Sequence, residues 1–290
     1  MASRFEFEAI GTSWVIDIPE ALSMDKERAL IDAIKTRIAD FDGAYSRFRD
    51  DSLVARISRA AGEYRLPDDA APMIALYREI YDLTGGLVTP LIGRTLSDAG
   101  YDAAYTLRPK ADIARPKRWE DVMEYEHPIL RVKEPVLLDF GALGKGYLID
   151  IVAGIIRERG IDVYTVDAGG DMAYRGAHPL RVGLEDPADS KKALGIAYVS
   201  SGQSVCGSAG NRRAWDRFHH IMDPRTAESP RHIAGLWVVA DTTMLADAIS
   251  TALFFVGPER LSKYSFEYAI VFADRSAVKS ARFAGEFFGA

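Results

Sequence analysis

A glycine-rich turn between an apolar run and an amphipathic segment constrains the fold of this chain more than any other feature. The run is Val136-Leu137-Leu138, the turn covers residues 139–146, and apolar side chains at helical spacing continue through Ile156. This order predicts a strand, a turn and a helix. A second glycine turn, Asp167-Ala168-Gly169-Gly170-Asp171, follows the β-branched run 163–166. Because strands and helices alternate in this way, we predict a mixed α/β fold.

The first of these turns has two interpretations. Backbone N–H groups at the start of a helix, together with the helix dipole, bind phosphate, and Lys145 would add a cation. The spacing, however, matches neither the Walker pattern nor the dinucleotide-binding fingerprint. Close packing of the helix on a sheet would also exclude side chains at Gly141, Gly144 and Gly146. The turn alone therefore does not decide between a phosphate site and a packing requirement.

Helical periodicity recurs elsewhere in the chain. Residues 25–41 and 68–83 carry apolar side chains at helical spacing, and Gly85-Gly86 ends the second segment. A further helix is predicted at residues 243–255. Between Leu87 and Tyr105 the prolines and glycines predict a loop.

Short β-branched and aromatic runs predict the strands. Residues 5–18 read as a strand with a bend or turn at Gly11-Thr12, and the chain is predicted to end in a short amphipathic tail. The other strands are predicted at 122–125, 129–132, 180–184, 194–199, 204–208, 236–240 and 268–272.

Composition limits the class of protein. The chain has 290 residues, of which 48% are hydrophobic and 27% charged, which is typical of a folded globular protein and excludes disorder or fibre. The net charge of -6 argues against a nucleic-acid partner, since phosphate-backbone binding needs clustered Lys and Arg. Cys206 is the one cysteine, so an internal disulfide and a thiolate zinc cluster are excluded, and we expect a small buried side chain.

The ends and the hydropathy of the chain bear on its location. Charged residues in the first eight positions, Arg4 among them, are not those of a signal peptide, and no apolar run is long enough to span a bilayer. We therefore expect a cytoplasmic protein without a membrane span, unless a leader has been removed. The oligomeric state stays open, a homo-oligomer included.

The predicted helix at 243–255 carries a pair of oxygen donors. Asp247 and Thr251 are four residues apart, so both side chains lie on one face, among small alanines that let another group approach. Carboxylate and hydroxyl oxygens suit Mg²⁺, which commonly holds a diphosphate at the same time. The alternative is that Asp247 complements the helix dipole and Thr251 bonds back to a carbonyl.

Two of the five histidines stand in the segment 218–226, beside Asp223-Pro224-Arg225. Histidine exchanges a proton near neutral pH, and the Asp-Pro pair forces the chain out of helix, so an imidazole would be held at a fixed place on a loop. Alternatively, His219 and His220 alternate across a strand edge, one outward and one packed inward, with Asp223-Pro224 as an ordinary turn.

Together, the two glycine turns, the histidine segment and the late helix resemble, in order and approximate spacing, the FAD:protein FMN transferase family, also called the ApbE family. The resemblance covers nearly the whole chain and includes Gly11-Thr12, Ser46-Arg47-Phe48 with Asp51-Ser52, and the segment from Gly85 to Leu96. It implies one domain, residues 1–290, built of two interleaved lobes with a central nucleotide cleft.

The resemblance also implies an activity. Such enzymes depend on magnesium, bind FAD, and transfer FMN to a threonine or serine hydroxyl of an acceptor flavoprotein, releasing AMP. Some similar proteins hydrolyse FAD to FMN and AMP or only bind flavin. A protein of another class, one that binds a metal for a structural or regulatory purpose without catalysis, is the remaining alternative.

Site residues follow from the same resemblance. His220 corresponds to the catalytic histidine, acting on a hydroxyl proton, and Lys145 shares the charge of the diphosphate. The metal ligands are Asp247, Thr251 and a main-chain carbonyl in the glycine turn, assigned to Gly144. The expected contacts to the flavin nucleotide are Gly11, Thr12, Phe48, Asp139, Gly141, Asp167, Gly169, Gly170, Ser208 and Asp223.

Several positions depart from the family pattern. Val88-Thr89 replaces a common Phe-Asp, Asp167 replaces Asn, and Ser208-Ala209-Gly210 replaces Thr-Ser-Gly. Ala227 stands for a frequent glycine, and Leu53 for an acidic residue. Most of these changes concern the expected flavin pocket, and Asp167 would bring unfavourable negative charge to a diphosphate unless it is paired or near the metal.

Overall fold

The computed structural model describes residues 2–211 and 213–288. Within them the largest sheet has the order β1-β2-β6-β7-β10-β13-β14-β15, and each neighbouring pair is antiparallel. Strands from both ends of the chain therefore share one sheet. These strands are β1 (Ser3–Ala9), β2 (Thr12–Ile18), β6 (Tyr164–Ala168), β7 (Asp171–Arg175), β10 (Ser204–Ala209), β13 (Ile233–Ala240), β14 (Phe266–Phe272) and β15 (Ala277–Lys279).

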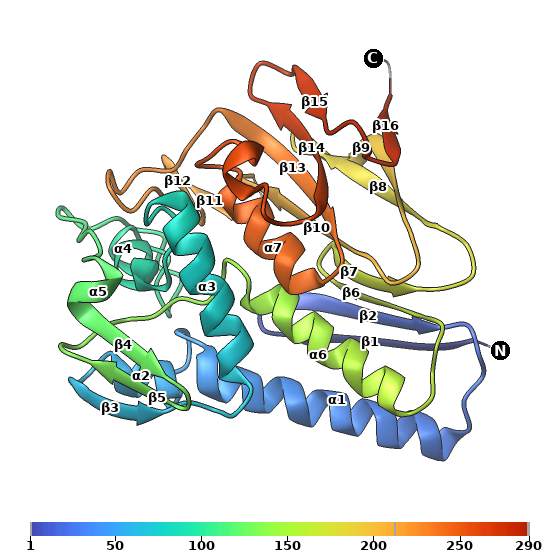
Figure 1. Cartoon of the computed structure of the whole chain (residues 1–290), viewed down its shortest axis with the longest axis horizontal. Helices are drawn as coiled ribbons and strands as arrows, with labels where there is room; N and C mark the ends of the chain where they lie inside the picture. Colours follow the sequence, from blue (N-terminus) through green and yellow to red (C-terminus); the bar gives the residue numbers. More distant parts are fainter. Residues whose placement is uncertain (1, 212, 289–290) are drawn as a thin grey trace.

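Helices cover one face of this sheet. In Figure 1, α6 (Gly144–Glu158) and α7 (Thr243–Ala252) lie next to it, with α1 (Met24–Tyr45) and α3 (Ala70–Thr84) packed outside them. The central strand β13 shows why both faces are covered: Leu236 and Val238 point into the core under the helices, while Trp237 and Val239 point to the other side. Alternation with a period of two delivers apolar side chains to both faces.

A small sheet packs against the opposite face. It has the order β16-β9-β8, made of β16 (Gly285–Phe287), β9 (Asp189–Val199) and β8 (Leu180–Asp186). Its side chains Val182 and Leu184 form one cluster with Trp237 and Val239 of the large sheet. The predicted mixed α/β class is confirmed.

The segment from α1 to α6 adds a third region. It contains a sheet of order β3-β5-β4 and several short helices, and a small hairpin from later in the chain packs beside it (Figure 1). These elements are α2 (Leu53–Ile57), β3 (Gly62–Arg65), η1 (Pro90–Ile92), α4 (Gly93–Asp98), α5 (Trp119–Val122), β4 (Met123–Glu126), β5 (Ile129–Val132), β11 (Ala214–Trp215) and β12 (Phe218–His219). The short helix η2 (Pro258–Leu261) follows α7 and contacts α3.

Local signals explain the helix ends. Ser23 caps α1 by accepting the N–H of Lys26, and Gly85, with φ of 64°, ends α3 in the left-handed conformation that favours glycine. The predicted helices at 25–41, 68–83 and 243–255 are confirmed. Five of their six ends lie within three residues of the predicted position. No helix among the described residues is both long and apolar enough to cross a membrane.

Three predictions of secondary structure are wrong. Val136-Leu137-Leu138 forms no strand, because β5 already ends at Val132 and the run reaches the glycine turn without a pairing partner strand. The predicted loop 87–105 contains η1 and α4, started by Thr89, whose hydroxyl accepts the N–H of Leu91. The predicted amphipathic tail forms β15 and β16, which pair with β14 and β9.

Candidate functional site

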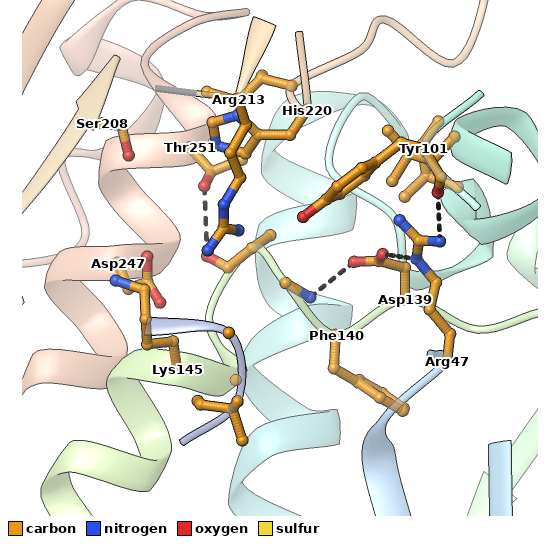
Figure 2. Close-up of a pocket in the computed structure, with 18 of the residues that line it drawn as sticks. Arg47, Tyr101, Asp139, Phe140, Lys145, Ser208, Arg213, His220, Asp247 and Thr251 are labelled. Atoms are coloured by element: carbon orange, nitrogen blue, oxygen red, sulfur yellow. Dashed lines mark hydrogen bonds and ion pairs between the residues drawn. The ribbon is translucent and has the colours of Figure 1, made fainter. Parts of the chain in front are cut away.

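A pocket of about 640 Å³ lies where the start of α6, the side of α7 and the turn between β1 and β2 meet. This volume is in the range of small-molecule sites. Figure 2 shows polar side chains converging on it from several elements, among them Lys145, Asp247 and His220. The pocket is therefore the place to test the predicted site residues.

The glycine turn is held in place by α3 and by its own first residue. Asp139 accepts the N–H of Gly141 at 2.7 Å, and the Tyr77 hydroxyl accepts the N–H of Ala142 at 3.2 Å. At Gly146 a Cβ would overlap the carbonyl oxygen of Thr243 and lie 2.8 Å from the Cβ of Asp247. Both interpretations of the turn thus apply, at different glycines: Gly146 permits close packing of α6 on α7, whereas Gly141 and Gly144 line the pocket.

Asp247 sits where α7 meets the start of α6. Its Oδ2 accepts the N–H of Gly146 at 2.9 Å, and the side chain is buried. Burial raises the pKa of this carboxyl, and the charge of Lys145 opposes the rise. The hydrogen bond from the start of α6 thus fixes the position of this buried carboxyl, which lines the pocket.

Thr251 lies one turn further along α7 and faces the same space. Its hydroxyl is 3.3 Å from the carbonyl oxygen of Ala142. Ala142 precedes α6, whereas Gly144 is its first residue, whose carbonyl belongs to the hydrogen-bond ladder of the helix. The carbonyl that the structure brings to Thr251 is thus that of Ala142 rather than that of Gly144.

Lys145 forms an ion pair with Asp171, which also accepts the N–H of Gly207 at 3.0 Å. Asp171 and the predicted contact Asp167 point to opposite faces of the sheet. In the hairpin of β6 and β7, Asp171 is paired with Ala168, which lies in the core under the helices, and Asp167 is paired with Met172, which packs on the other side. The alternation of side chains along the two strands thus directs Asp171 to the pocket and Asp167 away from it.

The donor atoms near Asp247 fit a hard cation. Ligand atoms of Asp171, Cys206 and Asp247 lie within 4.8 Å of one another. Burial raises the pKa of the Cys206 thiol well above its usual range, so it stays protonated and is a poor ligand. Asp171 is already paired with Lys145. Asp247, together with the Thr251 hydroxyl and the Ala142 carbonyl, therefore provides the oxygen donors of the pocket, and such a set suits Mg²⁺.

The far wall of the pocket is an ion pair surrounded by aromatic rings. Arg47 is paired with Asp139 through Nε, and its Nη1 donates to the Tyr101 carbonyl at 2.6 Å. The guanidinium carbon lies 4.2 Å from the centre of the Phe48 ring, which stacks on Tyr105. This wall offers flat apolar surface to a ring system.

The two histidines have different surroundings. His219 is buried: its Nε2 donates to the Pro230 carbonyl at 2.8 Å, and its ring packs near Phe254. His220 lines the pocket, and its Nδ1 has no hydrogen-bond partner among the described residues. Burial, followed by the nearby charge of Arg213, lowers the pKa of His220 to about 3, so the imidazole is neutral at physiological pH.

Most of the predicted site residues line the pocket. These are Gly11, Thr12, Phe48, Asp139, Gly141, Gly144, Lys145, Gly169, Ser208, His220, Asp247 and Thr251. Three predicted residues do not lie in its lining: Asp167, Gly170 and Asp223. Asp167 accepts the N–H of Gly170 at 2.8 Å, and Asp223 pairs with Arg225 in a turn.

The departures from the family pattern fall in different places. Val88, Thr89 and Ala209 line the pocket, so they shape the space for a ligand. Leu53 starts α2 and packs in the core. Ala227 has a φ of 59°, a left-handed conformation in which glycine is the more favourable residue.

Sequence reasoning did not assign Asp171, Arg47, Tyr101, Tyr105 or Arg213 to the site, although all five line the pocket. A signal was present for Asp171, which closes the second glycine turn, and for Arg47, which lies next to Phe48. The other three are placed by loops and a hairpin whose geometry no short motif encodes.

Comparison with known proteins agrees with this architecture. The model of the ApbE family matches residues 10–269. The FAD:protein FMN transferase of Escherichia coli K12 is 24% identical over 276 residues, covering 88% of this chain and 78% of that protein. The enzyme of the same name from Treponema pallidum is 25% identical over 289 residues, covering 89% and 79%.

Solved structures give the same result for the fold. The flavin transferase ApbE from Vibrio cholerae superposes with a TM-score of 0.80 at 20% identity, covering 98% of both chains. The ApbE protein from Thermotoga maritima does so with a TM-score of 0.79 at 22% identity, covering 97% of both. The fold is therefore that of the ApbE flavin transferases. The chain belongs to the ApbE family.

Proposed function

We propose that this protein is a magnesium-dependent FAD:protein FMN transferase, which moves FMN from FAD to a threonine or serine hydroxyl of an acceptor flavoprotein and releases AMP. One observation carries the proposal: hard oxygen donors of Asp247 and Thr251 share a pocket with the neutral imidazole of His220. Membership of the ApbE family and the names of the related enzymes support it.

The residues that would hold the metal are Asp247, Thr251 and the carbonyl of Ala142, since these oxygens lie together and none is a soft ligand. Mg²⁺ bound there would neutralise charge on the diphosphate of FAD. Lys145, held by Asp171 at the start of α6, adds positive charge where a helix N-terminus already favours an anion.

The transfer step needs one proton acceptor. The acceptor hydroxyl oxygen forms a bond to the FMN phosphorus, and the bond from that phosphorus to the bridging oxygen breaks. AMP leaves with the bridging oxygen, and the hydroxyl proton passes to His220. Neutral imidazole with an unpartnered Nδ1 can take this proton, and a nearby diphosphate would raise its low pKa towards the working range.

The test is incubation with FAD and Mg²⁺, with and without EDTA, followed by separation of FMN and AMP. With an acceptor flavoprotein present, we expect AMP release and flavin fluorescence that stays on the acceptor after denaturation. Free FMN in place of bound flavin would indicate hydrolysis. In the His220→Ala variant the rate should fall about 10²- to 10⁴-fold, and an unchanged rate would remove the proton-accepting role.

Three further parts of the proposal concern the whole molecule. We propose that residues 1–290 act as one domain and that the protein works in the cytoplasm. Light scattering would show whether it forms a homo-oligomer. Among the flavin contacts, we propose Gly11, Thr12, Phe48, Asp139, Gly141, Gly169 and Ser208, which line the pocket.

A further inference from the structure

The charged side chains that line the pocket are almost all paired with one another. Arg49 pairs with Asp42, Arg47 with Asp139, and Lys145 with Asp171. The charged groups of the lining are Asp42, Arg47, Arg49, Asp139, Lys145, Asp171, Arg213 and Asp247. Among the described residues, only Arg213 and Asp247 of this set are without an ion-pair partner, so one cation and one carboxylate stay available to a ligand.

Arg213 is held beside His220 by the small hairpin of β11 and β12. Ala214 pairs with His219, and the next residues outward are joined by the N–H of His220, which donates to the Arg213 carbonyl at 3.2 Å. Figure 2 shows the Arg213 side chain pointing toward the middle of the group of pocket side chains. Its charge acts on the pKa of His220, Tyr101 and Asp247, and all three residues line the pocket. The guanidinium therefore lies within reach of these groups in the pocket.

The two lining charges without an ion-pair partner, those of Asp247 and Arg213, suit two parts of one ligand. A carboxylate in reach of hard oxygens attracts a divalent cation, whereas a guanidinium with its five donors matches phosphate oxygens. A metal-bound diphosphate supplies both charges. Because Lys145 and Arg47 already have carboxylate partners, Arg213 can give its charge to phosphate without breaking an ion pair.

We propose that Arg213 is a substrate-binding residue that contacts non-bridging oxygens of the FAD diphosphate, in the pocket that Asp247 and Thr251 also line. This inference rests on the proposed use of FAD. It makes Arg213 the residue that distinguishes a diphosphate-containing flavin from riboflavin. During transfer its charge would also stabilise the phosphoryl group between the acceptor oxygen and the leaving AMP.

The test measures binding of three flavins by fluorescence quenching, in the presence of Mg²⁺, to the wild type and to Arg213→Gln. Loss of one charge-assisted contact should raise the Kd for FAD about 10- to 100-fold. The Kd for FMN should rise less, and that for riboflavin, which has no phosphate, should stay within about twofold. Arg213→Lys should lie between, since it keeps the charge and loses the planar fork.

Arg217 provides the matched control. It lies on the same hairpin, stacks over Phe218 and faces Glu228 at 3.6 Å, outside the pocket lining. Arg217→Gln removes one charge from the same element and should bind FAD like the wild type. Circular dichroism and thermal unfolding of both variants check that the hairpin and the fold are intact.

The outcomes separate this inference from the proposed function. If Arg213→Gln binds FAD as tightly as the wild type, or loses FAD and riboflavin equally, the assignment of Arg213 is overturned even when transfer occurs. If FAD binding alone weakens while the wild type releases no AMP, Arg213 is a diphosphate contact and the transferase proposal fails. Weakened FAD binding together with FMN transfer by the wild type supports both.

Discussion

The N-termini of α6 and α7 are each capped by a carboxylate from the other helix, but the two caps differ. Asp150 of α6 uses both oxygens on α7, accepting the N–H groups of Thr243 at 2.9 Å and Met244 at 2.8 Å. Asp247 of α7 uses only Oδ2 on α6, accepting the N–H of Gly146 at 2.9 Å. One arrangement closes a helix end, and the other leaves an oxygen facing the pocket.

This difference shows that residue type and burial do not identify a functional carboxylate. Burial raises the pKa of both Asp150 and Asp247. The start of α7 is also capped by Thr242, whose hydroxyl accepts the N–H of Leu245, whereas Leu143 at the start of α6 has no side-chain oxygen. The start of α6 thus stays open to an anion, and Asp247 stays open to a cation.

The largest expected effect comes from Asp247→Asn. The amide oxygen can still accept the N–H of Gly146, so the cap is kept while the charge is lost. We expect AMP release from FAD with Mg²⁺ to fall about 10²- to 10³-fold, with little loss of thermal stability. Asp150→Asn removes an equal charge and should keep the rate within about twofold; equal losses in the two variants would contradict the distinction between the caps.

Gly146→Ala should disturb the N-termini of α6 and α7 together. The added Cβ meets Thr243 and Asp247, so the helices must separate, which costs about 1–3 kcal/mol of unfolding free energy. Denaturant unfolding measures the loss. Gly154→Ala in the same helix is the control, because its Cβ would come no nearer than 3.8 Å, to Arg157 Nη2, and alanine favours helix. A destabilised Gly154→Ala, or an unaffected Gly146→Ala, would show that this contact does not set the packing.

Asp150→Ala should reduce stability and leave chemistry intact. Two N–H groups of α7 lose their acceptor, and we expect a loss of about 1 kcal/mol in the free energy of unfolding. The transfer rate per folded molecule should match that of the wild type. A large fall in this rate would mean that Asp150 also acts on the pocket.

The last prediction concerns stability at low pH, away from the pH at which the enzyme would work. The pKa of His220 is about 3 in the folded protein, below the usual 6.5 of histidine. Its contribution to stability is therefore complete above about pH 6.5 and is lost as pH falls towards 3. His220→Gln should lose stability less steeply than the wild type across this window, in urea unfolding series at successive pH values. Parallel curves would show that His220 titrates normally.

Much of the site could be predicted from local spacing. Asp247 and Thr251 lie on one helix, so a separation of four residues fixes their common face. His220 and Lys145 stand in short motifs whose backbone the local sequence sets. The fold class also followed from alternating strand and helix patterns.

Other parts depend on tertiary structure. Asp171 reaches the pocket because the register of β6 with β7 turns it to the helix side, and Arg213 because a short hairpin sets it beside His220. The Ala142 carbonyl is backbone, so its role depends on where α6 begins. The run Val136-Leu137-Leu138 misled the strand prediction, since these apolar residues pack against the core, Leu138 fully buried, without pairing in a sheet.

Strand β2 pairs with β6, joining residues about 150 positions apart, and the pocket draws on segments from Ile10 to Phe255. Contacts of such high sequence separation slow folding, because the entropy of closing long loops must be overcome before they form. The cavity is thus completed only when nearly the whole chain has folded. If the pocket binds FAD as proposed, the ligand would hold distant segments together, and at one hundred times its Kd it would add about 2.7 kcal/mol against their concerted unfolding.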